Sequence, residues 1–272
     1  MPTPEAHAPR TGPYPPRSAG SVGQVVVRLA AVFVDPAGDP AGVPSRDWLA
    51  LVNRQALAVR LIATTVHDVN NILQVVSGAA EVLALDPSPP AVAKRTTSIV
   101  GQAAAATAVL AGLTAFVRAE SDARDGARPL ALAQQVLAFR QHALRKGRIT
   151  AVAAGDDPEC AMARHRLQQV LLNLVLNAET ALGGRLEARV TIAVSAGDPV
   201  RIVVDDTGPG WAPGAAGAAD PWPPVPGPAP GALGLGLRVS RDLLAAVGGT
   251  LETGDAPEGG ARVTISIPAL RR

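Results

Sequence analysis

Polar side chains interrupt an apolar helical pattern at "VHDVNNIL", from Val66 to Leu73. His67 stands next to Asp68, and Asn71 follows His67 by four residues, one helical turn away on the same face. A neutral imidazole is a good nucleophile at physiological pH, and an adjacent carboxylate can orient it and take its proton. The trio indicates nucleophilic chemistry at His67, whereas a lone histidine on a helix is usually structural or merely exposed.

Two asparagines lie four residues apart in "RLQQVLLNLVLNAETAL", which runs from Arg166 to Leu182. Asn173 and Asn177 would share one helix face among leucines and valines that point to a core. Buried amides need polar partners. A metal ion with phosphate oxygens would supply them, and so would hydrogen bonds between the amides or to the backbone.

Two glycine-rich stretches follow. In "VVDDTGPGW", a strand ends at Asp206, whose carboxylate could accept a hydrogen bond from the amine of a purine, and Gly208 and Gly210 allow close backbone approach. In "GALGLGLRVSRDLLAAVGG", from Gly231 to Gly249, a glycine-rich loop opens a helix, so that free N–H groups and the helix dipole favour phosphate. Each motif is weak alone. The first also fits a simple turn and the second a flexible loop.

Two long helices must position His67. Apolar residues recur at alternating steps of three and four from Val52 to Val76, with Gln55 as the exception, and again from Ile99 to Val117. The breaker "DPSPP" between them predicts an antiparallel hairpin. One hairpin cannot bury both seams, so two copies should pair as a four-helix bundle. An ordinary coiled hairpin would show the same periodicity.

The remaining chain mixes helices and strands without a regular alternation, which predicts an α+β sandwich. Residues 1–44 are rich in proline and glycine and predict a disordered arm. We expect a helical dimerisation domain at 45–120, a polar linker, and a second domain at 129–270. Within the latter we predict helices at 130–146, 164–182 and 235–247, and strands at 187–195, 200–205, 250–253 and 262–267.

Composition excludes several classes of function. The net charge of +2 leaves no electrostatic footprint for nucleic acid, and the single Cys160 excludes an internal disulfide or a multi-cysteine metal site. Residues 1–23 lack the apolar core of a signal peptide. The uncharged run Thr96 to Val117 is long enough to cross a bilayer, but it consists mostly of alanine, threonine and glycine. We therefore expect no membrane span and a cytoplasmic protein.

Taken together and in this order, the four motifs resemble those of the sensor histidine kinases of two-component signalling. "HDVNN" resembles the phosphoacceptor box, Asn173 and Asn177 the N box, and "DTGPG" and "LGLGL" the two glycine boxes. The resemblance covers about Ser45 to Pro268. It implies a dimeric antiparallel helical hairpin, a four-helix bundle in the dimer, followed by an α/β-sandwich ATPase-like domain of the GHKL type.

The resemblance also implies roles. ATP would phosphorylate His67, with Asp68 as base or orienting partner, and the phosphoryl group would pass to an aspartate of a response-regulator receiver domain. Asn71 would aim a water molecule in a phosphatase reaction, and Asn177 would hold Mg²⁺. The nucleotide would be bound by Asn173, Asn177, Asp206, Gly208, Gly210, Gly234, Leu235 and Gly236. The signal would enter through the arm or from a separate sensor protein.

Departures from the family pattern bear on nucleotide binding, and one of them, the lid, predicts that binding is weak. The lid from Ala212 to Gly231 contains no lysine, arginine, threonine or phenylalanine, and Trp222 is its one aromatic residue. Relatives often place a basic or acidic residue after the second asparagine, where this chain has Glu179 and Thr180. The other histidines, at 7, 142 and 165, match no motif, and we expect them to be solvated.

Three alternatives stay open. A histidine phosphotransferase with a vestigial ATP domain would keep His67 and lose nucleotide binding. A GHKL-type ATPase would need a glutamate base one turn before Asn177, where this chain has Asn173, an amide that cannot deprotonate water. A purely structural coiled coil would leave the glycine boxes unexplained.

Overall fold

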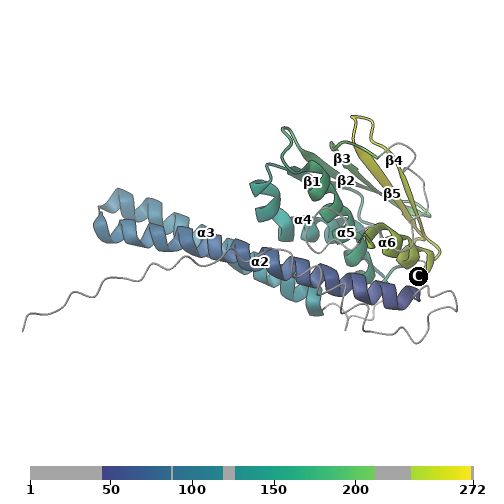
Figure 1. Cartoon of the computed structure of the whole chain (residues 1–272), viewed down its shortest axis with the longest axis horizontal. Coiled ribbons are helices and arrows are strands. Elements are labelled where there is room, and N and C mark those ends of the chain that lie inside the picture. Colours follow the sequence, from purple (N-terminus) through teal and green to yellow (C-terminus); the bar gives the residue numbers. More distant parts are fainter. Residues whose placement is uncertain (1–44, 87, 119–125, 212–233, 271–272) are drawn as a thin grey trace, which may run out of the picture.

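The structure is a computed structural model that describes residues 45–86, 88–118, 126–211 and 234–270 (Figure 1). The expected arm at 1–44 lies outside the described residues, as do the predicted lid at Ala212–Gly231 and the histidine at position 7.

Two long helices form the N-terminal part. Helix α2 spans Arg46–Leu85, and its N-cap Ser45 accepts a hydrogen bond from the backbone N–H of Trp48 at 3.3 Å. Helix α3 spans Pro89–Arg118 and begins with two prolines, which suit the first turn of a helix. The helices run antiparallel (Figure 1), so the predicted hairpin is confirmed.

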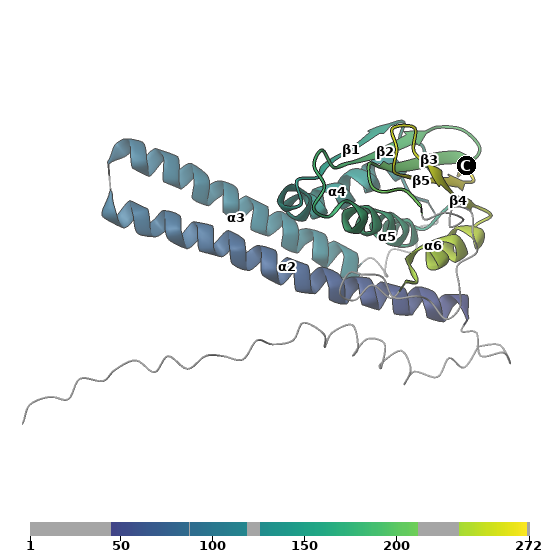
Figure 2. The ribbon, with the colours of Figure 1, turned by 45° about the horizontal axis from the view of Figure 1, so that its top comes forward.

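The C-terminal domain, residues 126–211 and 234–270, contains a five-stranded sheet in the order β1-β2-β3-β5-β4. Strand β1 pairs parallel to β2, and the other pairs are antiparallel. The helices α4, α5 and α6 cover one face of the sheet, and α2 runs beneath them (Figure 2). Helix bounds are Pro129–Lys146, Arg164–Leu182 and Gly236–Ala245, and strand bounds are Thr150–Gly155, Arg189–Ser195, Val200–Asp206, Thr250–Asp255 and Ala261–Ile267.

The sequence interpretation missed strand β1. Its residues "TAVAAG" are mostly alanine and glycine, which are depleted in strands. The strand lies at the sheet edge, where no alternating apolar face is needed. The other four strands were predicted because valine and isoleucine alternate along β2, β3 and β5 and point to the buried face.

The first half of α2 packs into the core of the C-terminal domain. Leu49, Val52, Leu57 and Leu61 are buried in one cluster with residues of α4, α5 and the sheet. Helix α3 also contacts α4, where a Cβ added at Gly112 would overlap the ring of Phe139. The hairpin is therefore joined to the C-terminal domain by a packed interface that the heptad pattern did not predict.

The predicted seam of α2 is uncovered at three apolar positions in the single chain. Ile62, Val66 and Leu73 are 45%, 55% and 52% exposed, and on α3 Val100 and Leu110 are exposed as well. The predicted dimer that would cover these side chains stays a prediction.

Both hairpin helices are long and apolar enough to cross a membrane by length and composition. The candidate spans are Arg46–Leu85, with 44% of its most apolar window buried inside the protein, and Pro89–Thr114, with 6% buried. Core helices of soluble proteins pass the same test, so the absence of a membrane span stays an expectation.

Candidate functional site

His67 lies on an exposed part of α2, with 56% of its side chain accessible, next to an Asp68 side chain that is only 10% accessible. Its Nδ1 lies 2.9 Å from Nδ2 of Asn71 and 3.6 Å from Oδ1 of Asp68. With the Asn71 amide reversed, Oδ1 of Asn71 would accept the Nδ1 proton. That orientation leaves the lone pair on Nε2, the nitrogen that points away from both neighbours.

The C-terminal end of α4 faces this pair. Nε2 of His142 lies 3.7 Å from Oδ1 of Asp68, and Nζ of Lys146 lies 3.5 Å from Nε2 of His67. The expectation that His142 is solvated was therefore wrong, because α4 packs across α2 and brings it to a carboxylate. His165 is likewise only partly exposed.

Asn173 is buried at the junction of three helices. Its Nδ2 lies 3.1 Å from Oδ1 of Asn53, 3.2 Å from the carbonyl oxygen of Gly236 and 3.3 Å from Oγ of Ser240. Gln169 donates to the same Asn53 oxygen at 2.9 Å. The sequence left open whether the buried amides bond to a metal and phosphate or to protein groups. In this structure the Asn173 amide has protein partners.

One face of α5 connects the two glycine-rich turns. Gly236, at the start of α6, lies against the Asn173 side chain, and Gly208 lies against the methyl group of Ala181. Asn177 is exposed and stands midway between them, because residues 173, 177 and 181 are one turn apart. The structure thus aligns the predicted N box with both predicted glycine boxes.

The turn after β3 holds the Asp206 carboxylate in a fixed orientation. Oδ1 of Asp206 accepts hydrogen bonds from the backbone N–H groups of Gly208 at 2.7 Å and Ala261 at 3.3 Å. A Cβ at Gly208 would fall 2.7 Å from that oxygen, so a side chain there would displace the carboxylate. Gly210 has φ of +75°, a left-handed conformation that favours glycine.

The second glycine box forms the entry to α6. Gly234 has φ of +70°, Leu235 is a buried N-cap residue, and Gly236 begins the helix. The first N–H groups of a helix have no partner inside the helix, so this end is suited to an anion. All eight residues expected at the nucleotide thus lie on α5 or in the two turns beside it.

A divalent cation at this face would have few protein ligands. Among the residues that the structure describes, no group of three or more histidine, cysteine, aspartate or glutamate side chains could hold a metal ion. Mg²⁺ is commonly held by one or two protein oxygens together with phosphate oxygens and water. The exposed amide oxygen of Asn177 fits such an arrangement.

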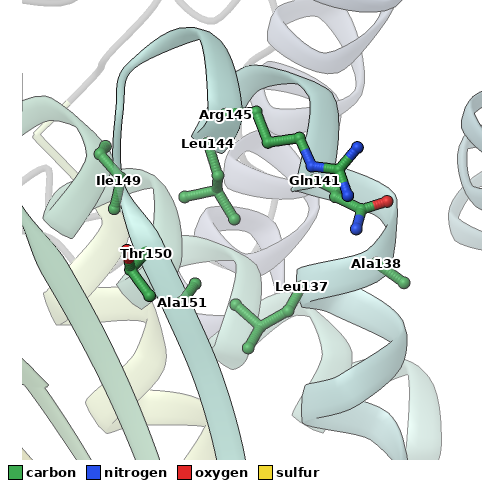
Figure 3. A pocket seen from close by; sticks show the side chains of 8 residues that line it. All are labelled: Leu137, Ala138, Gln141, Leu144, Arg145, Ile149, Thr150 and Ala151. Carbon is green, nitrogen blue, oxygen red and sulfur yellow. The ribbon is translucent and has the colours of Figure 1, made fainter.

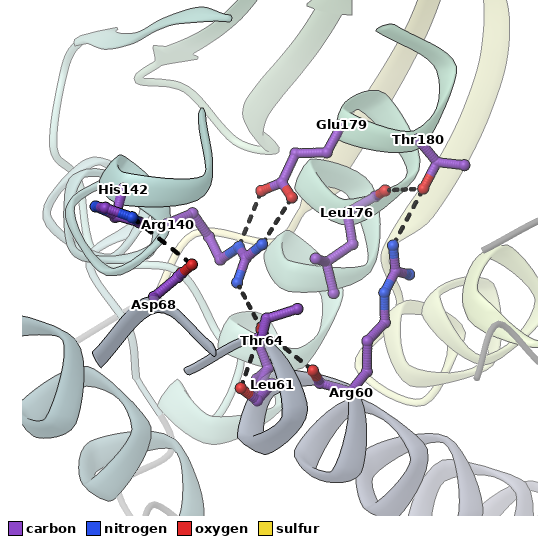
Figure 4. Close-up of polar contacts among 9 residues, drawn as sticks. All are labelled: Arg60, Leu61, Thr64, Asp68, Arg140, His142, Leu176, Glu179 and Thr180. Atoms are coloured by element: carbon purple, nitrogen blue, oxygen red, sulfur yellow. Dashed lines mark hydrogen bonds and ion pairs between the residues drawn. The ribbon is translucent and has the colours of Figure 1, made fainter. Parts of the chain in front are cut away.

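Several polar residues at the interface of hairpin and C-terminal domain were missed by the sequence interpretation (Figure 4). Arg140 of α4 donates to both carboxylate oxygens of Glu179, at 2.9 and 2.8 Å, and to Oγ1 of Thr64 at 3.3 Å. Arg60 of α2 donates to Oγ1 of Thr180 at 3.1 Å. Their signal in the sequence was the recurrence of polar residues at 53, 60 and 64 within the helical pattern.

A pocket of about 330 Å³ opens between α4 and β1 (Figure 3). Its lining holds none of the predicted site residues and consists of Leu137, Ala138, Gln141, Leu144, Arg145, Ile149, Thr150 and Ala151. It is therefore separate from the face that carries Asn173 and Asn177.

Comparison with known proteins gives matches to an ATPase family and to bacterial sensor proteins. Residues 162–271 match the family described as histidine kinase-, DNA gyrase B-, and HSP90-like ATPase. The C4-dicarboxylate transport sensor protein DctB of Pseudomonas aeruginosa is 39% identical over 105 residues, which cover 38% of this chain and 17% of that protein. The sensor protein KdpD of Escherichia coli is 27% identical over 232 residues, which cover 79% of this chain and 25% of KdpD.

The match also extends to solved structures. The catalytic domain of histidine kinase ThkA, 23% identical, aligns over 54% of this chain and 97% of that domain with a TM-score of 0.46. The chain spans about a sixth to a quarter of the length of the curated relatives named above. Residues 162–271 therefore match the histidine kinase-, DNA gyrase B-, and HSP90-like ATPase family, and the chain is similar in sequence to sensor proteins such as DctB and KdpD.

Proposed function

We propose that the protein is an ATP-dependent protein histidine kinase that phosphorylates its own His67 and passes the phosphoryl group to an aspartate of a response regulator. The observation that carries this proposal is the exposed His67 imidazole, engaged at Nδ1 by Asn71, on the helix that packs against the ATPase-family domain. The candidate nucleophile and the ATPase-family domain therefore belong to one chain and are in contact through α2.

The His67 neighbourhood supports a defined proton path. Nε2 attacks the γ-phosphorus of ATP, the bond to the bridging oxygen breaks, and ADP leaves with the bonding electrons. The phosphorylated ring is then a cation that still carries its proton on Nδ1. Asp68 takes it, since its Oδ1 lies 3.6 Å from Nδ1.

We assign the nucleotide to the α5 face between the two glycine boxes. Asp206 would accept a hydrogen bond from the adenine amine, and the backbone of the glycine-rich turns would wrap the sugar and phosphates. When bound at Asn177, Mg²⁺ would neutralise phosphate charge. Asn177 is exposed and Asp206 is held by two backbone N–H groups, which supports both roles.

The phosphates must approach His67 during transfer. Asn53, which contacts Asn173, precedes His67 by fourteen residues in the same helix, or about 21 Å along its axis. Either the ATPase-family domain moves along α2 towards His67, or the domain of a second copy brings the nucleotide.

The proposed partners are a response-regulator receiver domain, a second copy of the chain, and a signal input through residues 1–44 or a separate sensor protein. The uncovered apolar side chains of Ile62, Val66 and Leu73 support a homodimer. Both hairpin helices stay outside the membrane in this proposal, and the protein is cytoplasmic. The burial of Arg54 and the half-burial of Arg60 against other protein elements support this placement.

Incubation with γ-labelled ATP and Mg²⁺ tests the proposal. Wild type should acquire a label that acid removes and base does not, and His67→Gln should acquire none. A label that persists in His67→Gln would show that His67 is not the phosphorylated residue. An unlabelled wild type that still accepts phosphate from a phosphorylated receiver domain would favour the phosphotransferase alternative.

A further inference from the structure

We propose that Arg60, on the hairpin helix α2, is a phosphate-binding residue of the nucleotide site in the C-terminal domain. The inference rests on the proposed nucleotide site and adds a residue to it from the other domain. Arg60 would supply the side-chain cation that the lid between the glycine boxes lacks.

Helix α2 runs alongside α5 and in the same direction. Gln169 donates to the carbonyl oxygen of Ala50 at 2.9 Å, and Arg60 donates to Thr180 at 3.1 Å. The two helices therefore lie side by side for about three turns. Arg60 reaches α5 at its C-terminal part, which carries Asn177.

Thr180 places the guanidinium close to the proposed metal and phosphate position. It follows Asn177 by three residues, and side chains at that spacing are neighbours on a helix, with about 5–6 Å between their Cβ atoms. Figure 4 shows the Arg60 side chain extending from α2 to the Thr180 hydroxyl. A phosphate group bound beside Asn177 would therefore lie within reach of the Arg60 N–H groups.

The electrostatic surroundings of Arg60 favour an anionic ligand. A guanidinium has five N–H donors, and the hydrogen bond to Thr180 goes to a neutral hydroxyl. The carboxylate whose charge acts on Arg60, Glu179, has both oxygens engaged by Arg140. The pKa of Arg60 is lowered, chiefly by burial. The charge of Glu179 opposes this shift, and the charge of Arg140 adds to it. A half-buried cation with a neutral partner gains most when a charged acceptor arrives.

Neither the lid nor the part of α5 that carries Asn173 and Asn177 offers a side-chain cation, and the other arginines of the site, Arg238 and Arg241, lie on α6. The lid sequence from Ala212 to Gly231 contains no lysine or arginine, and neither does α5 from Leu167 to Leu182. Arginine binds phosphate through two parallel hydrogen bonds, which gives orientation as well as charge neutralisation. Arg60 would thus offset the weak affinity that the sequence of the lid predicts.

Arg60 also shares a side of α2 with the phosphoacceptor. Thr64 follows by four residues and His67 by seven, which is two helical turns or about 10 Å along the axis. Phosphates held at Arg60 would face the stretch of α2 that leads to His67. The same arginine would then orient the nucleotide towards its acceptor.

Titration calorimetry with Mg·ATP and with adenosine tests the inference. Arg60→Gln should weaken Mg·ATP binding about 10- to 100-fold, the loss expected for one charge-assisted contact to phosphate, and leave adenosine binding unchanged. Arg60→Lys should recover part of the loss. The matched control is Arg46→Gln on the same helix, because the exposed Arg46 guanidinium also reaches the C-terminal domain, at 3.6 Å from Oδ1 of Asp242. It should change neither affinity by more than about twofold.

The outcomes separate this inference from the proposed function. Equal losses for Mg·ATP and adenosine in Arg60→Gln would show that Arg60 only holds the two parts together. If wild type binds both ligands and Arg60→Gln binds Mg·ATP as tightly or more tightly, the proposed role of Arg60 is also overturned. A wild type that binds neither ligand would overturn the proposed nucleotide site itself, and with it the role of Arg60.

Discussion

The amide of Asn53 meets the amide of Asn173 across 120 positions of sequence, at 3.1 Å between Oδ1 of Asn53 and Nδ2 of Asn173. Both side chains are buried, and Gln169 donates to the same Asn53 oxygen. A polar cluster of this kind ties the hairpin to the α5 face on which the nucleotide is proposed to bind. The cluster should therefore contribute both to the stability of the fold and to the position of the proposed nucleotide site.

Replacing Asn53 by alanine should destabilise the protein by about 1–3 kcal/mol, the cost of leaving buried amides with fewer partners. The matched control is Asn70→Ala, an exposed asparagine of the same helix, which should change stability by less than about 0.5 kcal/mol. Urea unfolding followed by circular dichroism gives both values. Equal stabilities for the two variants would show that the Asn53 cluster contributes nothing to the interface.

Gly208→Ala should weaken adenosine binding about tenfold or more, the loss expected when a hydrogen bond to a charged acceptor is broken. The reason is steric, because the added Cβ would lie 2.7 Å from Oδ1 of Asp206 and push the carboxylate out of place. Gly254→Ala in β4 is the control, since its Cβ would meet no atom within 4 Å. Calorimetry that finds the two variants equal would remove Asp206 from the adenine site.

Asn71→Ala should slow dephosphorylation of the response regulator more than it slows labelling of His67. An exposed hydrogen bond such as that to Nδ1 contributes about 0.5–1.5 kcal/mol, so labelling should fall by about tenfold at most. In dephosphorylation the amide would aim the attacking water, a positioning role with a larger effect. Identical phosphatase rates for wild type and variant would leave Asn71 without that role.

The uncovered side of α2 should form a dimer. Val66→Glu together with Leu73→Glu should convert a dimer of wild type into a monomer, because both side chains are more than half exposed in the single chain. Leu186→Glu, which changes an 83% exposed leucine of the C-terminal domain, should remain dimeric. Light scattering at micromolar concentration distinguishes the species. A monomeric wild type would contradict the assignment of this surface to a dimer. Wild type that sediments with lipid vesicles would instead indicate that the surface binds a membrane, and would contradict it too.

Local patterns predicted the parts of the fold that local chemistry controls. Helices α4 and α5 were placed within one residue of their observed bounds, because proline begins α4 and apolar periodicity runs through α5. The glycines at 208 and 236 were singled out because their spacing signals close approach, and both lie against residues of the site. Periodicity also identified the hairpin and its exposed seam.

Contacts between distant segments could not be predicted in this way. The second packed side of α2 begins at Leu49 and meets partners as far as 120 positions away, and a single sequence does not identify such partners. Asn53 and Arg60 looked like ordinary polar positions of a long helix. Strand β1 was missed because its alanines satisfy the backbone pairing of an edge strand without a strand-like side-chain pattern.

The proposed kinase activity requires that a phosphoryl group moves from ATP to Nε2 of His67. After incubation with Mg·ATP, the chain should be digested under basic conditions and the peptides should be sequenced by mass spectrometry with a fragmentation method that preserves N–P bonds. We predict one phosphorylated peptide, modified at His67, which is absent from Asn177→Ala incubated in parallel. A phosphoryl group on any other residue, or an unmodified His67 in a preparation that binds Mg·ATP, would contradict the account.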